Sequence, residues 1–226
     1  MNKRRWLWAW LAVGCAGGLS AQNARLRLVH VSPDAPALDI LVNGTLVIEN
    51  LPYREYTEYL RVPAGGYGIQ LNAVATSEAL LHSSPALVAG RDYTALAVGY
   101  VGGKAPRLHL KVVEDDNSPP ASGAAKLRFL HAAPAEKDLD LYLTTPFETL
   151  EGKSPAVSGA PFEALSGYLT LPAGAYQARA TASNTKYALA DSRRLTFGNQ
   201  AIRTLVAVEL AARFTRLDFL VLPGPN

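Results

Sequence analysis

The chain repeats part of its own sequence, and this repeat is the feature that most limits how it can fold. Residues 26–30 read Leu-Arg-Leu-Val-His, and residues 127–131 read Leu-Arg-Phe-Leu-His, 101 positions later. Two further blocks recur in the same order, at 59–67 and 168–176 and at 94–98 and 204–208. Because three ordered blocks recur, we expect two tandem domains of one fold.

The spacing between the two copies changes along the chain. It is 101 residues at the first block and 109 at the second, so the second copy contains an insertion of about eight residues. In the first copy Asn43-Gly44 separates two apolar runs, a strong signal for a two-residue β-hairpin. The second copy has no Asn-Gly there, and we place the insertion between Thr144 and Pro161.

The local pattern predicts strands throughout. Residues 25–31 alternate between an apolar face and a face with Arg25 and Arg27, the period of a half-buried strand. Further short runs are rich in β-branched and aromatic residues, turn signals recur about every eight to twelve residues, and no helical periodicity is sustained. The expected strands are 38–42, 45–48, 55–62, 67–74, 79–82, 86–89, 93–101 and 107–113. An all-β, sandwich-like fold follows.

The N-terminus predicts export. Residues 3–5 are basic, residues 6–13 are apolar, and small residues follow to Ala21, so 1–21 is expected to be a secretory signal peptide cleaved near Ala21. A second reading is a lipid anchor at Cys15. The apolar run is shorter than the ~20 residues that span a bilayer, and no later stretch qualifies as a transmembrane helix. We therefore expect a periplasmic, cell-surface or extracellular protein.

Removal of residues 1–21 would leave a mature chain without Trp, Cys or Met and without net charge. All three Trp, the single Cys and the single Met lie in this leader, and so do three of the 22 basic residues, which leaves 19 against 19 acidic residues. A neutral domain lacks the electrostatic footprint of nucleic-acid binding. Without cysteines no disulfide framework forms, and stability must come from buried apolar surface. The expected domains are a first β-sandwich repeat at 22–114, a polar linker at 115–124 and a second repeat at 125–226.

One cluster of motifs carries a resemblance to a known family. Residues 30–36 read His-Val-Ser-Pro-Asp-Ala-Pro, Asp39 and the Asn-Gly at 43–44 follow, and residues 63–67 read Pro-Ala-Gly-Gly-Tyr. Together they resemble the bacterial domain of unknown function 4397 family, over both halves of the chain. The resemblance implies an immunoglobulin-like or prealbumin-like β-sandwich, often in tandem, in exported proteins, and no established activity. The second copy departs from the pattern, because residues 132–137 lack the Ser-Pro-Asp-Ala-Pro core.

Each copy carries a histidine followed nine residues later by an aspartate, His30 with Asp39 and His131 with Asp140. A His/Asp pair could act as an acid and base, so one alternative is a hydrolase-type enzyme using His30 and Asp39. The other reading is structural. A buried polar group without a partner costs roughly 1–3 kcal/mol, so a satisfied histidine is expected for stability alone. No nucleophile recurs beside these histidines, which favours the structural reading.

Other residues are candidates for binding a ligand. Ser32 and Asp34 belong to the first copy only, and Tyr53 and Tyr59 share strand parity and could stack on a ligand, although strand tyrosines also pack cross-strand. The candidate ligand-binding set is His30, Ser32, Asp34, Asp39, Tyr53 and Tyr59.

No metal, cofactor or catalytic motif stands out. The four histidines lack zinc-ligand spacing, and the acidic residues 114–117 lack the spacing of a calcium loop and are expected to be part of a solvated linker. Nucleotide-binding and serine-hydrolase motifs are absent from the sequence. We expect a non-catalytic binding or structural module whose partner is an envelope polymer, a glycan or a protein. A passive spacer or adhesion stalk is the third possibility.

Overall fold

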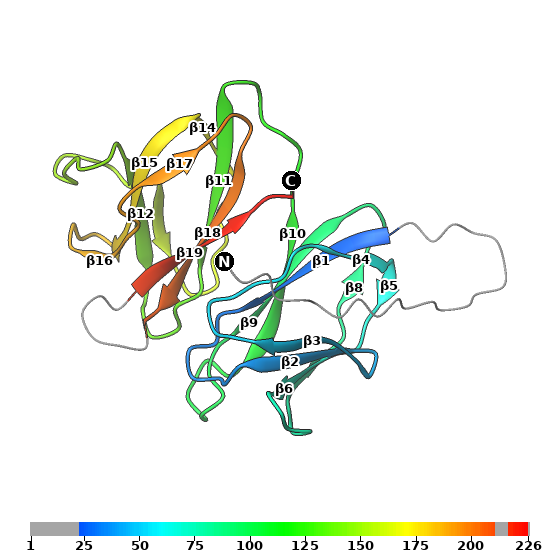
Figure 1. Cartoon of the computed structure of the whole chain (residues 1–226). Coiled ribbons are helices and arrows are strands. Elements are labelled where there is room, and N and C mark those ends of the chain that lie inside the picture. The colour runs from blue at the N-terminus through cyan, green and yellow to red at the C-terminus, as the bar shows by residue number, and fades with distance from the viewer. Residues whose placement is uncertain (1–22, 211–216, 226) are drawn as a thin grey trace. The chain divides into compact units, whose positions relative to one another are not determined.

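The computed structural model describes residues 23–210 and 217–225, and within these ranges every regular element is a β-strand (Figure 1). The all-β prediction is confirmed. The chain divides into two compact units, with the boundary between Asp116 and Asn117. The predicted signal peptide and Cys15 lie outside the described residues. Among the residues that are described, no helix has the length and apolarity to cross a membrane.

The first unit is a two-layer sandwich. One sheet has the order β10-β9-β1-β4, the other has the order β3-β2-β6-β7, and β5 pairs with β8. The strands are β1 (Asn23–His30), β2 (Leu38–Val42), β3 (Thr45–Leu51), β4 (Leu60–Pro63), β5 (Gly65–Gly66), β6 (Ile69–Ala73), β7 (Ala79–Ser83), β8 (Ala86–Leu87), β9 (Asp92–Val98) and β10 (His109–Asp115).

Alternation along the strands builds the core between these two sheets. Leu26 and Leu28 of β1 and Ile40 of β2 are buried in one apolar cluster, together with Leu71 of β6. Since successive side chains point to opposite faces of a sheet, the residues between them face away from this core. β1 and β9 pair in parallel, with Leu28 opposite Ala95, while β1 and β4 pair antiparallel.

Several predicted strands differ in extent; among them, 93–101 ends earlier, because β9 stops at Val98, and 55–62 begins later. The sequence predicts 55–62, but β4 begins at Leu60, and only an isolated bridge joins Tyr56 to Val29. The reason is Thr57, whose backbone N–H donates to the Leu28 oxygen at 2.9 Å while its hydroxyl oxygen accepts the Leu28 N–H at 3.0 Å. A side-chain oxygen replaces the backbone carbonyl of a regular ladder, so the strand is interrupted.

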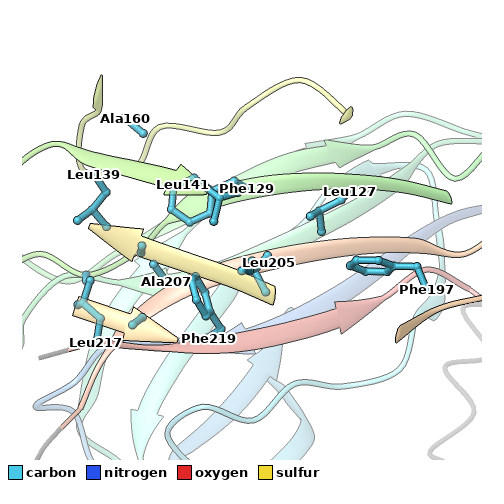
Figure 2. Packing of buried hydrophobic residues seen from close by; sticks show 14 of the residues in the cluster. Leu127, Phe129, Leu139, Leu141, Ala160, Phe197, Leu205, Ala207, Leu217 and Phe219 are labelled. Atoms are coloured by element: carbon cyan, nitrogen blue, oxygen red, sulfur yellow. The ribbon is translucent and has the colours of Figure 1, made fainter. Parts of the chain in front are cut away.

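The second unit has the same strand order. Its sheets are β14-β11-β18-β19 and β13-β12-β15-β16, with β17 on β15, and β11 pairs with β18 in parallel, as β1 does with β9. Figure 2 shows its core, where Phe129, Leu141, Leu205 and Phe219 pack together. The strands are β11 (Ala124–His131), β12 (Leu139–Thr144), β13 (Val157–Ala160), β14 (Leu169–Pro172), β15 (Gly174–Ala182), β16 (Ala188–Asp191), β17 (Leu195–Phe197), β18 (Ile202–Glu209) and β19 (Leu217–Pro223).

The two units differ most at one turn. In the first, β2 and β3 join through Asn43 (φ 49°) and Gly44 (φ 78°), residue types that adopt the left-handed conformation readily. In the second, residues 145–156 separate β12 from β13. Both the Asn-Gly hairpin and the insertion that replaces it are therefore confirmed.

Candidate functional site

His30 ends β1 and is fully buried, with 0% of its surface exposed. Its Nε2 donates to the Pro36 carbonyl oxygen at 3.0 Å, and its Nδ1 accepts the Ser32 N–H at 3.3 Å. Burial lowers the pKa of His30 to about 4, against the opposing effect of the Pro36 and Ala35 carbonyls. The ring is thus neutral at pH 7, and both nitrogens hold the loop that leads into β2.

His131 repeats this arrangement at the end of β11. Its Nε2 donates to the Lys137 oxygen at 2.6 Å, and its Nδ1 accepts the Ala133 N–H at 3.3 Å. Burial lowers its pKa as well, although the Lys137 carbonyl raises it in part. In both units the two ring nitrogens of the histidine bond to backbone groups and stabilise the loop that follows the strand.

An aromatic residue closes over each histidine. The Tyr53 ring meets His30 edge-on, with ring centroids 5.7 Å apart, and Phe162 meets His131 in the same way at 6.1 Å. Tyr53 stands in a turn where Arg54 has φ 66° and donates its N–H to the His30 oxygen at 2.8 Å. The first of the two candidate stacking tyrosines therefore packs against its own domain.

Asp39 lies in β2, in the other sheet. Leu38 and Ile40 point into the core, so Asp39 faces away from it. One carboxylate oxygen accepts the Asn50 N–H at 2.8 Å and the other accepts the Ala75 N–H at 3.2 Å. Both donor residues are left-handed, with φ of 55° and 58°. Asp39 thereby stabilises one left-handed residue on β3 and one in the turn that follows β6.

Asp140 of β12 has the same role. Its carboxylate accepts the N–H groups of Gly159 at 2.7 Å and Asn184 at 2.9 Å, whose φ angles are 57° and 61°. Burial alone raises the pKa of Asp140, but these two N–H groups and the hydroxyls of Ser183 and Ser158 outweigh it, so the pKa is lowered.

The His30/Asp39 pair considered from the sequence is not formed. His30 ends a strand of one sheet and bonds the backbone of the loop before β2, whereas Asp39 faces away from the core on the other sheet. The nine-residue spacing recurs because each residue holds its own part of the backbone.

Ser32 and Asp34 join two loops at the same end of the first sandwich as His30. The Ser32 hydroxyl donates to the Gly99 oxygen at 2.6 Å, and the Asp34 carboxylate accepts the N–H groups of Val101 at 2.8 Å and Gly102 at 2.9 Å. These contacts tie the loop between β1 and β2 to the loop after β9. The structure thus brings the end of β1 at His30 together with the loops that carry Ser32, Asp34 and Tyr53, and it places Asp39 elsewhere.

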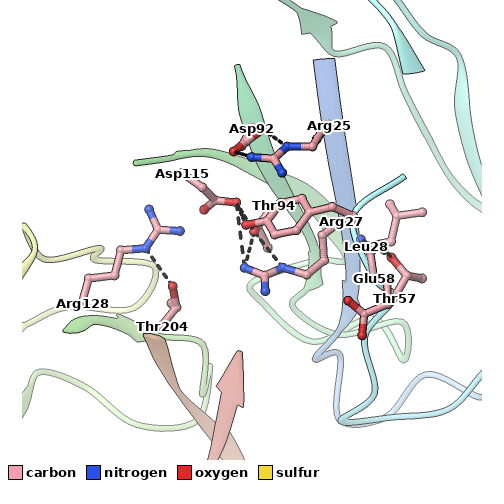
Figure 3. Close-up of polar contacts among 11 residues, drawn as sticks. Arg25, Arg27, Leu28, Thr57, Glu58, Asp92, Thr94, Asp115, Arg128 and Thr204 are labelled. Atoms are coloured by element: carbon pink, nitrogen blue, oxygen red, sulfur yellow. Dashed lines mark hydrogen bonds and ion pairs between the residues drawn. The ribbon is translucent and has the colours of Figure 1, made fainter. Parts of the chain in front are cut away.

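Tyr59 joins a polar network built around Arg27, Thr94 and Asp115, the three residues that Figure 3 shows linked by dashed lines. Its hydroxyl donates to the Asp115 carboxylate at 2.6 Å, and the Arg27 guanidinium lies 4.6 Å from its ring centroid. The Thr94 hydroxyl accepts from Arg27 at 2.9 Å and donates to Asp115 at 2.6 Å. Arg25, on the same face of β1 as Arg27, forms an ion pair with Asp92.

This network corrects the assignment of Asp115 to a solvated linker. Asp115 ends β10 and is 6% exposed. The sequence offered no signal for it, because its partners Arg27, Thr94 and Tyr59 come from distant segments and an acidic, Pro-rich context surrounds it. In the described part of the chain no group of three or more His, Cys, Asp or Glu is placed to hold a metal ion.

A family model now identifies the kind of domain. The model of DUF4397, a domain of unknown function, matches residues 24–142. The chain belongs to the DUF4397 family. The match covers His30 and the loop after it, spans the ten strands of the first unit from residue 24 on, and ends within β12 of the second unit. It confirms the family resemblance for one copy of the DUF4397 domain.

Solved structures with some similarity are distant. They include an α-glucan-binding streptococcal virulence factor (14% identity, covering 81% of this chain and 93% of that chain, TM-score 0.27). The TIE protein of Bacillus anthracis matches at 13% identity, covering 83% of this chain and 34% of that chain, with a TM-score of 0.27. Streptococcal family 41 carbohydrate-binding modules match at 13% identity, covering 81% and 93%, with a TM-score of 0.26. No curated protein matches the chain.

Proposed function

We propose that this protein is an exported, non-catalytic β-sandwich protein that acts as a binding or structural module of the cell envelope or extracellular space. The observation that carries the proposal is that the candidate catalytic side chains are already hydrogen-bonded to the protein's own backbone. Both ring nitrogens of His30 and both carboxylate oxygens of Asp39 bond to backbone groups of the protein itself. A general acid or base needs an atom within reach of a substrate. These residues instead hold loops and strands in place.

We also propose that the second unit is a second copy of the DUF4397 domain. Three features support this. The strand order of the two units is the same, the His131 ring bonds its loop as His30 does, and Asp140 holds two left-handed residues as Asp39 does. The basic and apolar leader supports export, since it has the organisation of a signal peptide.

Binding is tested with the full chain, expressed with its own leader in a bacterial host and purified after export. Peptidoglycan sacculi, chitin, cellulose and glycogen serve as insoluble or gel-embedded probes, and co-sedimentation or retarded migration is measured. We expect retention by at least one polymer without release of reducing sugar. Retention by none of them would favour the spacer reading.

The hydrolase alternative is tested with His30→Gln. An enzyme that uses His30 would lose its turnover while keeping its melting temperature. We expect the opposite, because the buried ring holds two backbone groups. A lowered melting temperature without any activity to lose supports the structural role, and hydrolysis of a probe that disappears in a stably folded His30→Gln variant would overturn the proposal.

A further inference from the structure

Phe147 is 90% exposed, more than any other large apolar side chain in the described residues. It lies in the insertion 145–156, within a turn closed by a hydrogen bond from the Glu148 N–H to the Thr145 oxygen at 3.3 Å. Pro146 and Phe147 are the two central residues, and Phe147 has φ 68°. A positive φ at this position favours Gly or Asn, and a bulky residue is an outlier there.

The two units make the equivalent connection with different residues. The first unit makes its equivalent connection with Asn43-Gly44, residue types suited to positive φ. The second unit places a phenylalanine where the backbone disfavours one, and it turns the ring toward solvent. Backbone strain of this kind clusters at functional sites, so Phe147 is a candidate position for a ligand contact.

Partly buried hydrogen bonds hold this turn in place. The Phe147 N–H donates to Gln177 Oε1 at 2.7 Å, and the Gln177 amide in turn donates to both oxygens of Asp191, at 2.8 and 2.9 Å. The Arg179 guanidinium donates to the Thr144 hydroxyl at 2.6 Å and to the Glu148 carbonyl oxygen. The loop is therefore anchored to β12 and β15 while the Phe147 ring projects outward.

The insertion also has a place to bury an apolar side chain, and Phe147 does not use it. Leu150, three residues on, is 6% exposed. The insertion therefore buries Leu150 and leaves Phe147, at the tip of the turn, exposed to solvent.

The surroundings indicate what the ring could contact. Glu148, the next residue in the chain, is ion-paired with Lys153 and accepts hydrogen bonds from Thr145. These contacts hold the pKa of Glu148 at about 2, so the residue after Phe147 carries a carboxylate at all ordinary pH values. A large protein interface needs a continuous apolar core. The other strongly exposed apolar side chain of this unit, Tyr187, follows the opposite end of β15. A sugar ring, with an apolar C–H face and a rim of hydroxyls, matches a single exposed aromatic ring whose next residue in the chain is a charged carboxylate.

We propose that Phe147 is a stacking platform for a sugar ring of a glycan, with the Glu148 carboxylate accepting a hydroxyl beside it. The proposal rests on the binding function proposed above and gives it a location and a ligand class. The Phe147 face supplies the contact area, and the rigid turn keeps the ring in its binding orientation before the ligand arrives.

The test uses the full exported chain with chitohexaose, cellohexaose and maltoheptaose as probes in calorimetric titrations. Binding to at least one should weaken about tenfold or more in Phe147→Ala, while Phe147→Tyr retains it. Phe147→Gly should also lose binding, yet its melting temperature should be unchanged or raised by up to about 4–8 °C because the turn strain is relieved. Tyr187→Ala, which removes another exposed aromatic ring, is the matched control and should bind normally.

Each contrary outcome overturns the proposal in its own way. Affinity unchanged in Phe147→Ala would move the site elsewhere and leave the proposed binding function intact. Equal loss in Tyr187→Ala would remove the special role of Phe147. Absence of binding to all three oligosaccharides, or binding of Phe147 to lipid vesicles or to a protein instead, would reject a glycan as the ligand.

Discussion

Acidification should destabilise the first unit through His30. In the folded protein the pKa of His30 is about 4, against 6.5 for the free side chain. Between these values the unfolded chain binds a proton that the folded chain does not, so stability is complete above pH 6.5 and falls as the pH drops toward 4. One pKa unit corresponds to about 1.4 kcal/mol, so the loss is on the order of 3 kcal/mol for this residue.

The His30→Gln variant isolates this contribution. A glutamine amide is neutral at every pH in this range. The stability of the variant should therefore depend less on pH between 6.5 and 4 than the stability of the unsubstituted chain. At pH 7 the variant should be less stable by about 1–3 kcal/mol, because the Pro36 oxygen and the Ser32 N–H lose the ring nitrogens that they bond to. His131 adds a dependence of the same sign in both proteins and cancels in the comparison.

Urea unfolding at pH 7, 6, 5 and 4, followed by circular dichroism, measures both effects. Because the chain has two compact units, the data are fitted with two transitions unless one suffices. The two proteins should differ most at pH 7 and converge toward pH 4. If the free-energy difference between them is the same at every pH, His30 is not a buried neutral histidine and the reasoning fails.

Three further predictions follow from single contacts and from the leader. Asp140→Asn should destabilise the second unit by about 1.5–3 kcal/mol, because one of two charge-assisted hydrogen bonds is lost. In the unsubstituted chain, protonation of this low-pKa carboxylate lowers stability below about pH 4, and the variant should lose less stability there. Urea titrations at pH 7 and 3 check both effects. Gly99→Ala should cost about 3 kcal/mol, because Gly99 has φ 89° and an added Cβ would lie 2.5 Å from the Arg107 carbonyl oxygen, and a melting temperature that does not fall would contradict this. The exported protein should show tyrosine fluorescence only, since every Trp lies in residues 1–21, and a tryptophan emission band would mean that the leader is retained.

Much of the fold could be predicted from local and repeated patterns. The alternation in residues 25–31, the Asn-Gly hairpin and the change in repeat spacing each correspond to a feature of the structure, because strand period and turn chemistry act over a few residues. The extent of the strand before Leu60 could not be predicted, since it depends on the Thr57 hydroxyl replacing a backbone acceptor.

The candidate site was harder to predict because it depends on contacts between distant segments. The alternation along β1 correctly separates Leu26 and Leu28 from Arg27, but it implies an exposed Arg27, which is buried against Thr94 and Asp115. Spacing also suggested a His30/Asp39 pair, although the two residues belong to opposite sheets. A period-2 pattern gives the face on which a residue lies and says nothing about what covers that face.

The recurring and non-recurring residues of the two units have different uses. Those that recur, the histidines at the strand ends and the aspartates of β2 and β12, bond to backbone groups of their own unit. Ser32 and Asp34 do not recur, which made them candidates for a ligand, yet they too bond to the backbone of a neighbouring loop. Among the non-recurring features, the insertion with Phe147 is the one whose conformation and exposure both work against stability, and this is why a ligand is best sought there.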